Sequence, residues 1–133
     1  MVPGRVEQLA EQGDGVAQPP RVGVHGIQHG FQGGAAGNSV FYNAYVGAYM
    51  AIYAEPFTDN IRVRVANNPW GPWSEAGLLF TGEPAWSGGN DYAAFAHPEF
   101  STGNGQVQYI TYVHTTGFLQ QEIPLTQVVF RNP

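Results

Sequence analysis

The side chains best suited to holding a polar ligand lie in and just after one glycine-rich loop. The loop ends in Asp91 and Tyr92 and also carries Trp86. His97 follows, and Pro98 favours an extended backbone at the histidine before it. A polyhydroxylated ligand needs aromatic rings to stack on its apolar face and amide, imidazole or carboxylate groups to bind its hydroxyls. These residues predict a carbohydrate site, and the alternative is that His97 is a neutral histidine inside the core.

Few residues of the sequence indicate a metal or cofactor site. His25 and His29 have the spacing of a helical metal pair, but a glycine follows each of them and no acidic residue lies between them. The turns "GGNDY" and "GNG" are not followed by the Lys-Ser/Thr pair that completes a phosphate loop. Cysteine is absent, which excludes disulfides and thiolate chemistry. We therefore expect neither a metal nor a cofactor.

The composition predicts an all-β domain. The chain has 133 residues, enough for one domain, and combines 18 Gly, 10 Pro and 14% aromatic residues with only 11% charged residues. These proportions are typical of short strands joined by tight turns. The formal net charge of -5, without any lysine, disfavours nucleic acid and membrane surfaces as partners. Neither a secretory signal nor a membrane span is recognisable, and the localisation stays unknown.

The chain divides into an arm and two groups of predicted strands. Glycine and proline punctuate residues 1–37 and predict an irregular arm with at most one strand, near Arg21–Val24. Runs of strand length then fill residues 38–133, in one group at about 38–82 and a second at about 92–131.

Turn signals separate the individual strands. The first group contains "SVFYNA", "AYMAIYAE", "IRVRVANN" and "EAGLLFTG", and the second contains "FAHPEFS", "QVQYITYVHT" and "EIPLTQVVF". A period of two puts Ile61, Val63 and Val65 on one face of their strand. Arg62 and Arg64 lie on the other face, which we expect to be solvated.

The turn "PWGPWS" places Trp70 and Trp73 around a Gly-Pro pair. Pro69 and Pro72 fix their own φ angles and make the turn rigid. We expect both tryptophans to pack against the strands that the turn connects. The alternative is a surface platform on which a sugar stacks.

The two groups of strands repeat each other. Two aromatic pairs have one separation of 59 residues: Phe41 with Phe100 (100 − 41) and Tyr53 with Tyr112 (112 − 53). At that offset His97 takes the place of Asn38. In each group a short strand, a glycine-containing turn and an aromatic strand follow in order, which is typical of four-stranded propeller blades. The alternative is chance similarity between two β-meanders.

The chain resembles the C-terminal blades of five-bladed β-propellers related to glycoside hydrolase family 43 and to secreted propellers with domain of unknown function 4185. The resemblance covers about residues 37–130 and rests on "SVFYN", "PWGPWS" and "HPEF", which occur in the family order. It implies a partial propeller, because the chain has room for about two blades of the expected number of about five.

The resemblance also implies where a ligand lies. The family's funnel lies on the propeller axis, where the inner strand of each blade begins. Asn38 and His97 would begin two such strands, beside the loop that carries the other candidates. The implied ligand-binding residues are His97, Asn38, Asp91, Tyr92 and Trp86.

Catalytic residues remain unknown at this stage. Hydrolysis of a glycosidic bond needs two carboxylates across the scissile bond. Asp91, Glu99 and Glu55 are the acidic residues near predicted strand ends on the funnel side, and none lies in a diagnostic motif. They are weak catalytic candidates, and whether the chain is an enzyme stays undecided.

Two functions follow from these observations. The first is a carbohydrate-binding or carbohydrate-processing propeller module without a complete catalytic set, whose partners are an oligo- or polysaccharide. The second is a non-catalytic structural or interaction domain that oligomerises through exposed blade edges. Because two blades leave faces uncovered, we expect self-association or packing on missing blades.

Overall fold

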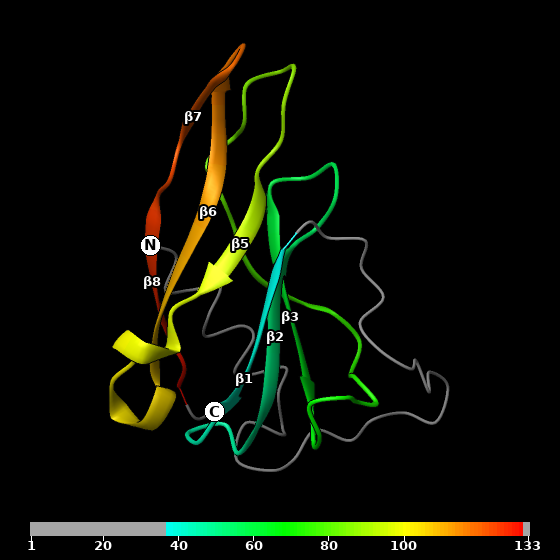
Figure 1. The fold of residues 1–133 in the computed structure, drawn as a ribbon, viewed down its shortest axis with the longest axis vertical. Helices are drawn as coiled ribbons and strands as arrows, with labels where there is room; N and C mark the ends of the chain where they lie inside the picture. The colour runs from blue at the N-terminus through cyan, green and yellow to red at the C-terminus, as the bar shows by residue number, and fades with distance from the viewer. Residues whose placement is uncertain (1–36, 132–133) are drawn as a thin grey trace.

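The computed structural model describes residues 37–131. The predicted arm before residue 37, its strand near Arg21–Val24 and the pair of His25 and His29 lie outside the described residues. Residues 37–131 are all-β, as predicted, and form two antiparallel four-stranded sheets that pack against each other (Figure 1).

The first sheet is a meander with the order β1-β2-β3-β4. Its strands are β1 (Asn38–Asn43), β2 (Ala48–Ala54), β3 (Asn60–Ala66) and β4 (Gly77–Thr81). β2 and β4 lie within the runs that the sequence marks as strands, and β1 and β3 each begin one residue before theirs. Gly47 ends the turn between β1 and β2 with a φ of 75°, a left-handed value that costs glycine little.

The second sheet is built around one long strand. Its strands are β5 (Tyr92–Ala96), β6 (Val107–Gly117), β7 (Gln120–Glu122) and β8 (Leu125–Val129). Both β7 and β8 pair with β6, β7 along its last residues and β8 along its first. The prediction that the second group repeats the four-stranded meander is therefore wrong. Pro124 lies between β7 and β8 and has no N–H to donate to β6.

The segment "FAHPEFS" is not one strand, contrary to the prediction. β5 ends at Ala96, and the short 3-10 helix η2 (Pro98–Phe100) follows His97. Proline suits the first position of such a turn, because its N–H is not needed there and its φ is already fixed. A second 3-10 helix, η3 (Gly103–Gly105), makes the turn into β6.

The predicted offset of 59 residues is correct at the hairpin turns. Asn43 pairs with Ala48 at the end of β1. Thr102 and Val107, which are 59 residues further on (43 + 59 and 48 + 59), form the corresponding bridge. The two sheets therefore begin their second strands in the same way.

The offset fails beyond the turn, at the candidate site residues. Asn38 pairs with Tyr53, so the offset predicts that His97 lies opposite Tyr112. The N–H of His97 instead donates to the carbonyl of Tyr109 at 2.9 Å, because Pro98–Phe100 coil into η2, whereas the corresponding residues of β1 stay extended and pair with β2. His97 follows the end of a strand and does not begin one.

One apolar core lies between the two sheets. Both sheets contribute side chains that are at most 1% exposed: Met50, Ile52, Ile61, Leu79 and Phe80 from the first, and Ile110, Val128 and the nearby Phe130 from the second. Neither sheet buries these side chains without the other.

A polar connection joins the sheets at their hairpin turns. Asn43 is 1% exposed, and its Oδ1 accepts hydrogen bonds from the N–H groups of Tyr45 and Val46 at 3.0 and 3.1 Å. Its Nδ2 donates to the carbonyl of Gly105 at 2.9 Å. One buried amide thus fixes the β1–β2 turn and connects it to the turn before β6.

The outer face of the first sheet is largely covered. Trp73 is 6% exposed and packs on Ala51 and Ala66. Arg64 donates from Nε to the hydroxyl of Tyr53 at 3.3 Å and is half-buried. The prediction of a solvated arginine face is therefore wrong, because the "PWGPWS" turn folds back over it.

The predicted packing of the two tryptophans is confirmed for Trp73 and wrong for Trp70. Trp70 is 70% exposed, on the outside of the same turn. Only the second tryptophan reaches the sheet.

This difference predicts unequal losses of stability. Trp73→Ala should lower the free energy of unfolding by about 3–5 kcal/mol, because it removes a buried aromatic side chain. Trp70→Ala is the matched control and should change it by no more than about 0.5 kcal/mol. Urea denaturation followed by circular dichroism measures both, and equal losses would contradict the assignment.

Candidate functional site

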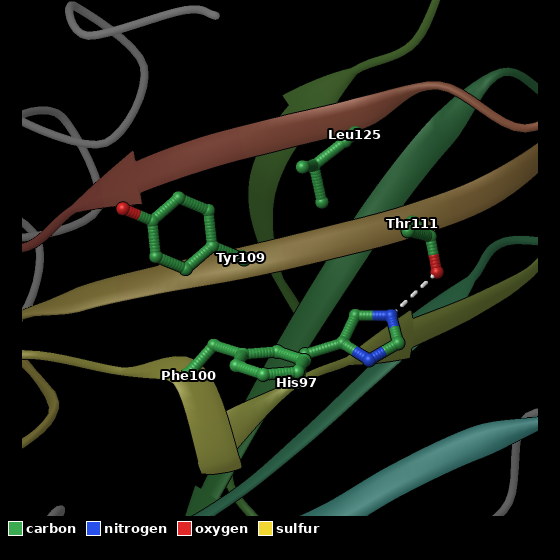
Figure 2. A pocket seen from close by; sticks show the side chains of 5 residues that line it. All are labelled: His97, Phe100, Tyr109, Thr111 and Leu125. Atoms are coloured by element: carbon green, nitrogen blue, oxygen red, sulfur yellow. Dashed lines mark hydrogen bonds between the residues drawn. The ribbon is translucent and has the colours of Figure 1, made fainter.

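The candidate site is an open groove on the outer face of the second sheet (Figure 2). Its volume is about 350 Å³, and its lining residues are His97, Phe100, Tyr109, Thr111 and Leu125. Figure 2 shows the rings of His97 and Phe100 along one side and Tyr109 and Leu125 along the other.

Three elements supply these side chains. Tyr109 and Thr111 are alternate residues of β6 and therefore share its outer face, while Ile110 between them points into the core. Leu125 begins β8 and is 64% exposed. The 3-10 helix η2, with His97 just before it and Phe100 at its end, closes the other side of the groove.

Hydrogen bonds hold both nitrogens of the His97 ring. Nδ1 lies 3.3 Å from Oε1 of Glu99, and Nε2 lies 2.8 Å from Oγ1 of Thr111. A carboxylate only accepts hydrogen bonds, so Nδ1 carries a proton, and in the neutral ring Nε2 then accepts the proton of the Thr111 hydroxyl. The ring is therefore fixed in place while its side chain stays 31% exposed.

Aromatic surface is available beside this imidazole. Phe100 is 66% exposed, and its ring centroid is 6.4 Å from that of His97 with 37° between the ring planes. Tyr109 accepts a hydrogen bond at its hydroxyl from Nε2 of Gln127 at 3.2 Å. The lining of the groove is thus almost entirely apolar, and polar groups stand only at its edges.

The structure separates His97 from the loop candidates. Tyr92 begins β5 and His97 follows its end, so five strand residues place them roughly 15 Å apart. The hydroxyl of Tyr92 accepts a hydrogen bond from Gln121 at 2.6 Å, and Trp86 is 42% exposed with its ring against Gly88.

Asn38 lies nearer to His97 than these loop residues do. Its chain neighbours contact β5: the Phe95 ring lies against Gly37, and the hydroxyl of Ser39 accepts a hydrogen bond from the N–H of Ala96 at 2.9 Å. Asn38 itself is exposed, and its side chain does not line the groove. The five predicted ligand-binding residues therefore do not form one site.

Asp91 is buried between the sheets, away from the groove. Its side chain is 0% exposed, and Oδ1 lies 2.8 Å from Nδ1 of His114, whose side chain is 11% exposed. Oδ2 has no hydrogen-bond partner. Burial raises the pKa of the Asp91 carboxyl above its ordinary range, against the opposing effect of the hydrogen bond from His114. Burial also raises the pKa of the neighbouring Tyr112.

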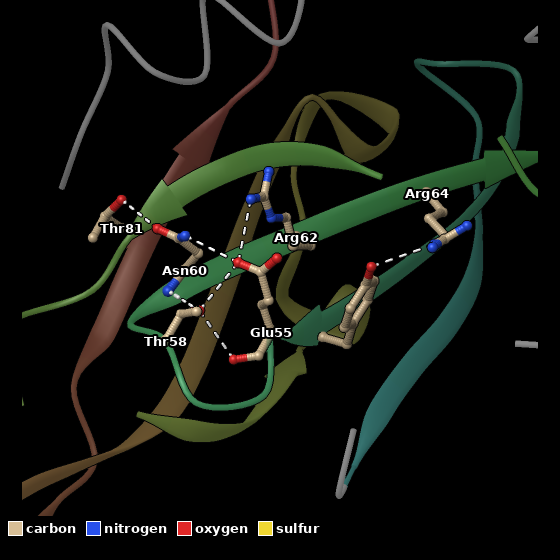
Figure 3. A network of polar contacts seen from close by, with 7 residues as sticks. Glu55, Thr58, Asn60, Arg62, Arg64 and Thr81 are labelled. Atoms are coloured by element: carbon tan, nitrogen blue, oxygen red, sulfur yellow. Dashed lines mark hydrogen bonds and ion pairs between the residues drawn. The ribbon is translucent and has the colours of Figure 1, made fainter. Parts of the chain in front are cut away.

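Glu55 belongs to a polar network at the β2–β3 turn (Figure 3). Its Oε2 accepts hydrogen bonds from Thr58, Asn60 and Arg62 at 3.1, 3.0 and 3.2 Å. The hydrogen bond from Asn60, followed by that from Arg62, lowers the pKa of the Glu55 carboxyl despite its partial burial. Thr81 extends the network through Asn60, so these contacts fasten the turn to β4.

The three acidic candidates therefore occupy three separate environments. Asp91 is in the core, Glu55 is in a turn, and Glu99 beside His97 has a side chain that is 58% exposed. Glycoside hydrolysis requires two carboxylates facing one cleft. The groove places only Glu99 of these three next to its lining residues.

Sequence reasoning missed His114 and most of the groove. The alternation along β6 puts His114 on the same face as Ile110 and Tyr112, and a polar side chain on a buried face requires a partner. That signal could have identified His114, with Asp91 as the nearest acid before β5. No sequence pattern indicated that Leu125 lines the groove, because its position there depends on the long-range pairing of β8 with β6.

Between residues 37 and 131, no three His, Asp or Glu side chains lie close enough together to hold a metal ion. No helix in that range is long and apolar enough to cross a membrane.

Comparison of the chain with known protein families, with curated proteins and with solved structures gives no match. The function must therefore be inferred from the geometry of the chain itself.

The buried carboxyl of Asp91 predicts a specific pH dependence. Since the pKa of the Asp91 carboxyl is raised in the folded state, the protonated carboxyl stabilises the fold. This stabilisation is complete below the ordinary pKa of aspartate and is lost as the pH rises through the raised value. Asp91→Asn removes the charge and keeps an oxygen that can accept from His114. Relative to this variant, the wild type should lose stability as the pH rises above about 4, the ordinary pKa of an aspartate.

Thermal unfolding of both proteins across this range measures the difference. If the wild type instead gains stability relative to Asp91→Asn as the pH rises, the contact with His114 outweighs burial and the assignment is wrong.

Proposed function

We propose that this chain is a carbohydrate-binding module and that its two sheets are adjacent blades of a partial β-propeller. The observation that carries the proposal is the groove at His97, in which a fixed imidazole lies beside the exposed ring of Phe100. The proposal places the ligand in this groove and not at the loop of Trp86 and Asp91.

The chemistry of the groove suits a neutral sugar. Apolar C–H faces of a pyranose or furanose stack on rings such as Phe100, and sugar hydroxyls donate hydrogen bonds to acceptors at the rim. Oγ1 of Thr111, held in place by His97, keeps lone pairs that can accept, and the carboxylate of Glu99 accepts as well. The same carboxylate would repel an acidic sugar.

The packing of the sheets supports the assignment to blades. The first sheet is a four-stranded meander, and the second packs its inner face on the first across one core. Adjacent propeller blades pack in this way. The shared hairpin at the start of each sheet agrees with the resemblance drawn from the sequence.

Binding is favoured over hydrolysis. Retaining and inverting glycosidases place two carboxylates about 5 to 9.5 Å apart across the scissile bond. Glu99 is the candidate acid at the groove, while Asp91 and Glu55 are held elsewhere by His114 and by the β2–β3 turn.

Calorimetric titration with arabinan and xylan oligosaccharides tests the proposal. His97→Ala should weaken binding by about 1–3 kcal/mol, because polar groups of the ligand or of Thr111 lose their partner. Phe100→Ala should weaken it through lost stacking. Trp70→Ala is the matched control, an exposed aromatic residue outside the groove.

Both groove variants must keep the melting temperature of the wild type, so that weaker binding does not reflect a loss of folding. Unchanged affinity in both groove variants together with lost affinity in Trp70→Ala would move the site to the outer turn and refute the proposal. An absence of binding to every oligosaccharide would favour the second function below.

A second candidate function is an interaction domain that assembles through the second sheet. The observation that favours it is apolar surface on that side of the molecule, where Phe95, Ile123 and Leu125 are 41%, 70% and 64% exposed. Apolar surface of this kind marks protein contacts when it is contiguous.

Sedimentation velocity over a range of concentrations tests this second function. It predicts an assembly that Ile123→Lys dissociates, since a charge cannot be buried there without a partner. Val40→Lys, an exposed position on β1, is the control and should leave the assembly intact. A monomer at every concentration would rule this function out.

A further inference from the structure

Phe57 occupies the tip of the β2–β3 turn in an unusual conformation. The N–H of Thr58 donates to the carbonyl of Glu55 at 3.3 Å and closes the turn, with Pro56 and Phe57 as its two central residues. Phe57 has a φ of 63° and is 93% exposed. The second central residue of such a turn is normally glycine or asparagine, because a left-handed φ suits them.

The turn between β6 and β7 repeats this arrangement. Gly117 pairs with Gln120, which leaves Phe118 and Leu119 as the central residues. Leu119 has a φ of 54° and is 88% exposed, and Phe118 is 77% exposed. A large apolar residue again stands where glycine or asparagine is usual. We call Phe57, Phe118 and Leu119 the apical tips.

The loop between β4 and β5 connects the two turns at one end of the molecule (Figure 1). The N–H of Ala85 donates to Oδ2 of Asp59 in the first turn at 3.3 Å. The N–H of the next residue, Trp86, donates to the carbonyl of Thr115 near the end of β6 at 2.8 Å. Trp86 is itself 42% exposed and adds a further ring at this end.

These side chains cost the fold stability and gain no burial in return. The left-handed region is unfavourable for a residue with a Cβ, because the Cβ comes too close to the following carbonyl oxygen. Strained positions of this kind concentrate at functional sites. Two of them at the same end, each with a large exposed apolar side chain, indicate a contact surface.

The acidic side chains at this end indicate the charge of the partner. Asp59 lies on the first turn, Glu83 on the loop and Glu122 at the end of β7, and the last two are exposed. Among the described residues, Arg62 on β3 follows Asp59 in the chain and is already paired with Glu55 at 3.2 Å. An anionic membrane or the same end of a second copy would be repelled, whereas a basic protein surface would be attracted.

We propose that the apical tips insert into apolar pockets of a protein partner whose surrounding surface is basic. Buried aromatic and leucine side chains at the centre of the contact would supply affinity, and the surrounding acids would supply orientation and rate of association. This surface is separate from the groove at His97, and the two bindings are independent.

The strain argument is tested by stability alone. Phe57→Asn and Leu119→Asn place a residue that tolerates the left-handed region at each tip, so each should raise the melting temperature by several degrees. Trp70→Asn, at an exposed tryptophan with ordinary φ at the opposite end of the first sheet, should not raise it. Unchanged or lower melting temperatures for both tip variants would overturn the inference.

The partner's chemistry is tested with three immobilised helical peptides, composed of leucine with lysine, leucine with glutamate, and serine with lysine. The wild type should bind the first most tightly, and the double variant Phe57→Asn/Leu119→Asn should bind it about tenfold more weakly. The Trp70→Asn control should bind as the wild type does. Equal binding by the double variant, or equal binding of the leucine-glutamate peptide, would overturn the proposal.

Phosphatidylcholine vesicles provide the remaining comparison. Co-sedimentation of the wild type with these vesicles, lost in the double variant and without binding to the leucine-lysine peptide, would assign the tips to a bilayer surface and overturn the protein partner.

Discussion

The apolar core shared by the two sheets is the constraint on which the rest of the structure depends. Each sheet is amphipathic, and a sheet of this size cannot keep its apolar face in water. Met50 and Ile52 of β2 and Ile110 of β6 are almost completely buried because the two sheets face each other. Since the inner face of β6 is committed to this core, its alternate residues must point outward, and these are the residues that form the groove.

Buried polar contacts then fix how the sheets meet. At one end Asn43 satisfies the turn of the first sheet and bonds to Gly105 of the second. At the other end Asp91 contacts His114, which ties the connecting loop to β6. Such contacts are specific because an unpaired buried amide or carboxylate is costly. They leave the outer face of the second sheet accessible, with His97 held in place on it.

The sequence predicted the all-β class and the strands of the first sheet, because alternation and turn residues act locally. It did not predict the groove. Pro98 starts a 3-10 helix that breaks the repeat between His97 and Asn38, and this effect depends on how β5 pairs with β6. It also did not predict that Asp91 is buried, because burial there depends on His114, which lies on another strand. Long-range pairing decides both outcomes.

The outer face of the second sheet is the proposed binding site for a neutral sugar. Amide chemical-shift mapping of the labelled protein during titration with xylan and arabinan oligosaccharides is the decisive experiment. We expect shifts to concentrate at residues 97–100, at 109–111 and around Leu125, which line the groove. Shifts confined to the loop of Trp86 and Asp91, or to the turn of Trp70, would contradict it.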